Sequence, residues 1–88
     1  MSYEVLLHPK ASRFLENTDN PLEKRIREKL KTLSTEPEKG KKLKHSDLWR
    51  LRIGDYLAIY EIKPSKENVV VLFIGHRKDV YDDFSKLI

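Results

Sequence analysis

A β-hairpin is predicted by the run Leu48-Trp49-Arg50-Leu51-Arg52-Ile53-Gly54-Asp55-Tyr56. Apolar side chains alternate with two arginines along its first six residues, and such alternation places the two kinds on opposite faces of a strand. Gly54-Asp55 suits a two-residue hairpin loop, and the return strand then covers residues 56–63. In the resulting register, Ile53 lies opposite Tyr56, Arg52 lies opposite Leu57, and Arg50 lies opposite Ile59.

The two faces of this hairpin differ in character. One face is apolar and is expected to pack on helices; its members are Trp49, Leu51, Ile53, Tyr56, Ala58 and Tyr60. The other face carries Arg50 and Arg52 beside Leu57 and Ile59. Because that face mixes charged and apolar side chains, it need not be fully covered.

The residues before the hairpin predict one strand and two helices. Alternation over Ser2–His8 indicates a strand, and Lys10–Asn17 is typical of a short helix. A longer helix is expected to begin with Asn20 as N-cap, followed by Pro21 and Glu23 at positions that helix starts favour. Its apolar stripe comprises Leu22, Ile26, Leu30 and Leu33. An antiparallel helical hairpin therefore precedes the sheet.

The residues after the hairpin predict one more strand and a last helix. Val69–Gly75 is apolar on both faces, as in a strand that lies inside a sheet. Asp79 is expected to N-cap a helix from Val80 to Leu87, with Phe84 and Leu87 on its apolar side. The order is strand–helix–helix–strand–strand–strand–helix. It predicts one small α+β domain over residues 1–88, with a mainly antiparallel sheet and the helical hairpin on one face.

Charge is distributed unevenly along the 88 residues. The net charge is +4, but residues 39–52 alone carry six basic side chains and one acidic side chain. Concentrated positive charge attracts polyanions. The alternative is a solvated lysine loop without a partner.

Composition excludes several classes of protein. The chain has no cysteine, so a disulfide framework and a thiol nucleophile are excluded. Its three histidines are scattered without ligand spacing, so we expect neither a metal nor a cofactor. No apolar run is long enough to span a membrane, and the N-terminal residues do not resemble a signal peptide. We therefore expect a cytoplasmic protein without a membrane partner.

The arginines suit the cleavage of RNA by its neighbouring 2′-hydroxyl. That reaction needs a group that removes the 2′-proton, a cation that stabilises the phosphorane, and a proton for the leaving 5′-oxygen. Arg50, Arg52 and Arg77 can bind phosphate oxygens through their planar forks. Tyr81 can take the proton only if nearby cations lower its pKa. His76 is a candidate for the leaving-group acid.

Each assignment has a structural alternative. Arg50 and Arg52 could be ordinary solvent-facing residues of an amphipathic strand. Tyr81 lies at helical spacing from Phe84 and could simply pack. His76 and Arg77 would face opposite ways in a continuing strand, and of the two we prefer Arg77 for the site.

The run from Leu48 to Tyr56, followed by Tyr60 and then Ile74-Gly75-His76-Arg77-Lys78-Asp79-Val80-Tyr81, resembles the RelE branch of the RelE/ParE toxin superfamily. This resemblance covers nearly the whole chain. It implies a toxin of a type II toxin–antitoxin pair, acting as a metal-independent, ribosome-dependent endoribonuclease (an mRNA interferase). Such an enzyme cleaves mRNA in the ribosomal A site and so inhibits translation.

The resemblance also implies site residues and partners. The catalytic set is Arg77, Tyr81, Arg52 and Arg50, and contacts to RNA or the ribosome are expected from Lys41, Lys42, Lys44, His45 and His76. The partners are a RelB-like antitoxin, the ribosome with its mRNA, and operator DNA indirectly through the antitoxin. The sequence departs at Leu57, where well-known members carry another arginine.

Two other functions stay open. ParE-like members of the superfamily poison DNA gyrase and generally lack the combination of three arginines and the tyrosine. A non-catalytic basic adaptor that binds nucleic acid and protein is the third alternative.

Overall fold

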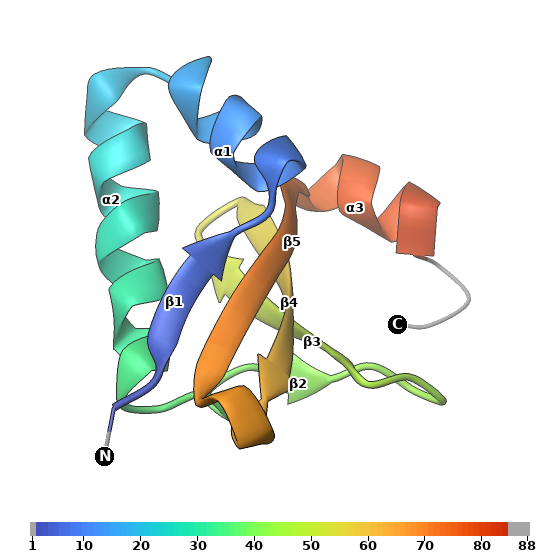
Figure 1. Cartoon of the computed structure of the whole chain (residues 1–88). Helices are drawn as coiled ribbons and strands as arrows, with labels where there is room; N and C mark the ends of the chain where they lie inside the picture. The colour runs from blue at the N-terminus through green and yellow to red at the C-terminus, as the bar shows by residue number, and fades with distance from the viewer. Residues whose placement is uncertain (1, 85–88) are drawn as a thin grey trace.

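The described chain passes through its helices and strands in the predicted order, with one additional short strand (Figure 1). A computed structural model describes the backbone of residues 2–84 and the side chains of residues 2–80. The elements are β1 (Glu4–Leu7), α1 (Pro9–Glu16), α2 (Asn20–Lys31), β2 (Lys41–Lys42), β3 (Leu48–Ile53), β4 (Tyr56–Lys63), β5 (Asn68–His76) and α3 (Arg77–Phe84). Within residues 2–84, no helix has both the length and the apolar character needed to span a membrane.

The sheet has the strand order β1-β5-β4-β3-β2. β1 is parallel to β5, and the other three pairs are antiparallel, so the mainly antiparallel sheet is confirmed. The β3–β4 hairpin has the predicted register, with Ile53 opposite Tyr56 at the loop. Gly54 takes the first loop position with a φ of 63°, a backbone conformation that glycine adopts without steric cost.

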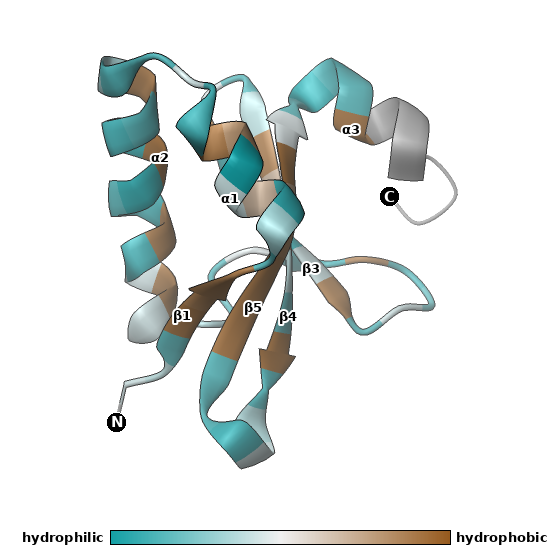
Figure 2. Ribbon diagram, turned by 45° about the horizontal axis from the view of Figure 1, so that its top comes forward, coloured by the Kyte–Doolittle hydropathy of each residue, from teal (hydrophilic) through white to brown (hydrophobic). Residues whose placement is uncertain are grey.

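The larger core lies between the sheet and the helical hairpin. α2 turns its apolar stripe toward the sheet and its charged side toward solvent, as Figure 2 shows. The predicted inner face of the β3–β4 hairpin belongs to this core, because Leu51, Ile53, Ala58 and Tyr60 are all buried in it. Trp49 packs at its margin, with its ring stacked 6.3 Å from that of Tyr60.

A second, smaller core covers part of the opposite face. It consists of Leu43, Leu57, Ile59 and Val80, with Leu48 and Phe73 at its edge. Val80 comes from α3, so the last helix packs on the hairpin face that was not expected to be fully covered. The arginines of β3 lie on this same face, beyond the apolar cluster.

The structure corrects two helix starts. Asp19, with an extended backbone (φ −57°, ψ 143°), is the N-cap of α2, and its carbonyl accepts the N–H of Glu23 at 2.8 Å. The prediction of Asn20 as N-cap is therefore wrong by one residue. α3 begins at Arg77, so Asp79 lies in its first turn and is not the cap. Residues 85–88 and the side chains of Tyr81 and Phe84 lie outside the described residues.

Candidate nucleic-acid interface

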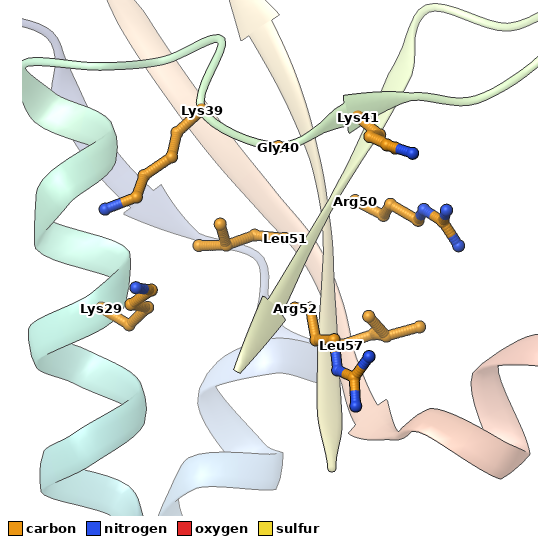
Figure 3. A pocket seen from close by; sticks show the side chains of 8 residues that line it. All are labelled: Lys29, Lys39, Gly40, Lys41, Arg50, Leu51, Arg52 and Leu57. Carbon is orange, nitrogen blue, oxygen red and sulfur yellow. The ribbon is translucent and has the colours of Figure 1, made fainter. Parts of the chain in front are cut away.

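A basic hollow of about 410 Å³ opens at the outer edge of β3 (Figure 3). We call it the β3-edge hollow; it is lined by Lys29, Lys39, Gly40, Lys41, Arg50, Leu51, Arg52 and Leu57. Five of these residues are cations, and the described residues that line it include no carboxylate. A group of five cations around one hollow creates a positive local potential, which favours a polyanionic ligand.

The pleat of β3 delivers the two arginines to this hollow. Arg50 and Arg52 are two residues apart and therefore project to the same face of the sheet. Lys41 of β2 lies directly opposite Arg50 and adds its charge to that face. Arg52 is exposed, and its Nε donates a hydrogen bond to the carbonyl of Gly54 at 3.1 Å. That bond directs the guanidinium along the hairpin toward its loop.

A buried tyrosine fixes the turn that carries Lys39. The Tyr60 hydroxyl donates to the carbonyl of Pro37 at 2.8 Å and accepts the N–H of Gly40 at 3.1 Å. Burial raises the pKa of Tyr60 above its ordinary value, the N–H of Gly40 opposes that shift, and the charge of Glu38 adds a smaller increase. The phenol is therefore protonated at neutral pH and can donate.

Gly40 lets the turn approach β3 closely. A Cβ at this position would lie 2.0 Å from the carbonyl oxygen of Arg50. No side chain larger than hydrogen fits there without moving the backbone. Gly40 and Tyr60 together set the position of residues 37–41 over the β3-edge hollow.

The backbone of Arg77 is tied to the loop of the β3–β4 hairpin. As the first residue of α3, it donates its backbone N–H to the carbonyl of Asp55 at 2.7 Å. Arg52 and Arg77 are thus held by two consecutive residues of one loop. Arg77 does not line the β3-edge hollow. Tyr81 lies one turn further along α3, and its side chain is outside the described residues.

His76 lies in a different hollow, of about 770 Å³, between α1 and the end of β5. Its ring meets that of Tyr56 edge-on at 5.4 Å, and its Nδ1 accepts the N–H of Lys78 at 3.2 Å. Phe14 continues this aromatic group, with its ring centroid 6.0 Å from that of Tyr56. The structure therefore separates His76 from Arg50 and Arg52.

The remaining predicted contact residues surround the loop before β3. Lys42, Lys44 and His45 line a third hollow, of about 510 Å³, with Asp47 at its rim. His45 has a φ of 56°, in the left-handed region. Of the predicted lysines, only Lys41 joins the two arginines of β3 in one hollow.

Leu57 occupies the place where the resemblance would put another arginine. Its side chain is 1% exposed and packs in the small core with Ile59 and Val80. The residue that departs from the family pattern therefore supports α3 on the sheet.

Sequence reasoning did not place Lys29, Gly40 or Tyr60 at this interface, and it counted Lys39 only as part of the basic segment 39–52. Lys29 lies outside the predicted apolar stripe of its helix. A helical period cannot reveal that it borders a hollow formed by a distant strand. Among the described residues, no three side chains of His, Asp or Glu gather in a way that could hold a metal ion.

The chain is similar to known toxins of one class. Residues 5–81 match the family model described as the ParE toxin of the type II toxin–antitoxin system parDE. A search of curated proteins found no match.

Solved structures have the same fold. The matched chain of the RelBE2 toxin–antitoxin complex from Mycobacterium tuberculosis is 28% identical, with a TM-score of 0.81 over 88% of this chain and 100% of that chain. The matched chain of the archaeal RelE-RelB complex from Pyrococcus horikoshii is 29% identical, with a TM-score of 0.75 over 88% and 97%. The isolated RelE toxin of E. coli is 20% identical, with a TM-score of 0.75 over 97% of both chains.

Proposed function

Because the chain belongs to the ParE toxin family of type II toxin–antitoxin systems, we propose that it blocks translation as a ribosome-dependent endoribonuclease. Its substrate is mRNA in the ribosomal A site, and its reaction is attack of a 2′-hydroxyl on the adjacent phosphate without a metal. The observation that supports this proposal is the β3-edge hollow, where Arg50, Arg52 and Lys41 converge and where no carboxylate is found among the described residues that line it.

The proposed reaction forms a bond between the 2′-oxygen and phosphorus and breaks the bond from phosphorus to the 5′-oxygen. Negative charge grows on the phosphate oxygens during this step, and guanidinium forks stabilise such charge. Arg50 and Arg52 hold the phosphate in this scheme, and Arg77 stabilises the phosphorane. Tyr81 is assigned the removal of the 2′-proton in this scheme. His76 lies in the separate aromatic hollow, so in this scheme water supplies the proton that the leaving 5′-oxygen takes.

Dependence on the ribosome follows from the kinds of residue in the site. Arginine binds phosphate strongly but hardly ever loses its proton, so it cannot serve as a base. A site rich in arginine therefore gains most from a substrate whose 2′-oxygen is already aligned with the scissile bond. The ribosome supplies that alignment by holding the message, and fixed geometry of this kind lowers a barrier substantially.

The proposed partner that silences the toxin is a RelB-like antitoxin. Complexes of RelB and RelE proteins have been solved from M. tuberculosis and P. horikoshii. In this chain, an acidic antitoxin helix either covers the β3-edge hollow or displaces α3. Operator DNA is then a partner only through the antitoxin. Charge reversal at Lys41, Lys42 and Lys44 should weaken the complex and its dependence on salt.

Primer extension on message bound to programmed ribosomes tests the nuclease. We expect wild-type protein to cut within the A-site codon, and Arg77→Ala and Tyr81→Phe to cut less. Arg25→Ala, which removes an exposed arginine of α2, is the matched control and should cut like wild type. Absence of cutting by wild type, beside an active control toxin, would refute the proposal.

Inhibition of DNA gyrase is the second candidate, because the matching family model is that of the ParE toxin. A supercoiling assay separates the two. Gyrase poisoning without cleavage of message would establish the second candidate in place of the first. If the protein neither cleaves message nor poisons gyrase, but still binds nucleic acid and protein, it is a non-catalytic adaptor.

A further inference from the structure

The cations of the β3-edge hollow lie on both faces of the sheet. Lys41 and Arg50 project to the face that carries α3. On the opposite side of β3, Lys39 extends toward α2, and Lys29 stands on α2 (Figure 3). Leu51, which alternates with the arginines, points toward the same side as those two lysines. The hollow therefore passes around the edge of the sheet and is not confined to one face.

The edge of β3 is open where these two groups meet. β2 is only two residues long and pairs with Trp49 and Arg50. Beyond Arg50, no strand of the described chain covers the outer side of β3 before the hairpin loop. A ligand can therefore lie against this edge and contact side chains on both faces.

Lys29 and Lys39 are held near this edge by the fold. Lys29 is half-buried on α2, whereas Lys24 and Lys31 of the same helix are exposed. Lys39 lies in the turn fixed by Tyr60 and donates its backbone N–H to the carbonyl of Glu36 at 3.1 Å. Neither lysine takes part in the ion pairs Arg27–Glu23 and Lys63–Glu61.

Five cations around one hollow repel each other, and this repulsion opposes folding. A bound chain of phosphates removes it and releases counterions at the same time. On these grounds, and resting on the proposed nuclease function, we infer that Lys29 and Lys39 form a second RNA-phosphate subsite on the helix face of β3. The RNA backbone crosses the sheet edge between this lysine pair and Arg50 with Arg52.

The test measures the salt dependence of RNA binding. Fluorescence anisotropy with a labelled, uridine-rich single-stranded RNA compares wild type with Lys29→Gln/Lys39→Gln. The control Lys24→Gln/Lys31→Gln removes the same charge from α2 without touching the β3-edge hollow. Circular dichroism verifies that both double variants are folded.

Loss of two phosphate contacts has a defined signature. The slope of log K against log salt should become shallower by about 1.4, because each single-strand contact contributes about 0.7. Affinity at about 0.1 M salt should fall by about 25-fold if binding near 1 M salt is unchanged. For the control Lys24→Gln/Lys31→Gln, both the change in this slope and the loss of affinity should be much smaller. Equal losses in both double variants would overturn the inference, since they would reflect net charge alone.

Two further arms identify the ligand. The first arm measures binding to vacant small ribosomal subunits. If Lys29→Gln/Lys39→Gln weakens this binding, the phosphates belong to ribosomal RNA. If it weakens only the binding of free single-stranded RNA, they belong to the message. Polyglutamate serves as the probe for an acidic protein. If the variant loses polyglutamate binding and keeps RNA binding, the subsite is not an RNA site. Because no arm requires cleavage, failure of the nuclease proposal in primer extension remains distinguishable from failure of this inference.

Discussion

The backbone N–H of Arg77 lies 2.7 Å from the carbonyl oxygen of Asp55, and this bond joins the start of α3 to the tip of the β3–β4 hairpin. The carbonyl of Gly54, the residue before Asp55, accepts a hydrogen bond from the Nε–H of Arg52. The hairpin loop therefore sets the relative position of two candidate catalytic arginines. It also satisfies an amide at the N-terminus of α3 that has no partner within the helix.

Arg52→Lys should cut message much less than wild type, although the charge is kept. Lysine cannot reproduce the planar fork, and it loses the directed bond to Gly54. Removing one such donor typically lowers a rate constant by about 100-fold to 1,000-fold. Single-turnover cleavage on programmed ribosomes measures this, with Arg25→Lys as control. A rate within a factor of about two of wild type would mean that charge alone is needed at position 52.

Gly40→Ala should destabilise the protein more than Gly54→Ala. At position 40 the added Cβ would collide with the carbonyl of Arg50, and overpacking of this kind costs about 1–3 kcal/mol. At position 54 nothing lies within 4 Å, so only the positive φ opposes the change, at about 1 kcal/mol. Urea denaturation gives both values. The reverse order would show that the turn before β2 is free to move.

Tyr60→Phe should lower stability and change its dependence on pH. Loss of the hydroxyl leaves Pro37 and Gly40 without their partner, at a cost of about 1–3 kcal/mol. In the wild type the pKa of Tyr60 is raised on folding. The phenol therefore ionises first in the unfolded state, so its contribution is fully present below about pH 10 and is lost as the pH rises through the folded pKa.

The Tyr60→Phe variant lacks this loss of stability at alkaline pH. Urea denaturation from neutral pH to about pH 11 should show the stability gap between the two proteins narrowing as the pH rises. Tyr3→Phe, which removes the hydroxyl of another tyrosine at the margin of the same core, is measured beside it as the matched substitution. A gap that stays constant would contradict the raised pKa.

Leu57→Arg should destabilise the protein, although it matches the family pattern. The new charge would enter the small core beside Val80, and an unpaired buried charge costs several kcal/mol. Leu6→Arg is the matched control, because Leu6 is 38% exposed on β1. Thermal unfolding should show a much larger decrease in Tm for position 57. Equal decreases would mean that α3 does not depend on Leu57.

The hairpin and the common side of the β3 arginines could be predicted because they depend only on residues that are close in the sequence. A period of two fixes both faces of β3, and Gly54 marks the turn, so Arg50 and Arg52 had to share a side. The β3-edge hollow was not predictable as a whole. Lys29 enters it through the packing of α2 on the sheet, and Gly40 through a close approach to β3. β5 ends at His76 and α3 begins at Arg77, and this junction could not be located to the residue from the sequence.

The parallel pairing of β1 with β5 has a consequence for when the sheet can form during synthesis. The strand made first lies beside the strand made last, so β1 has no neighbour in the sheet until residues 68–76 have left the ribosome. Contacts between such distant parts of a chain form late in folding. All five strands must therefore be synthesised before β1 can take its place at the edge of the sheet.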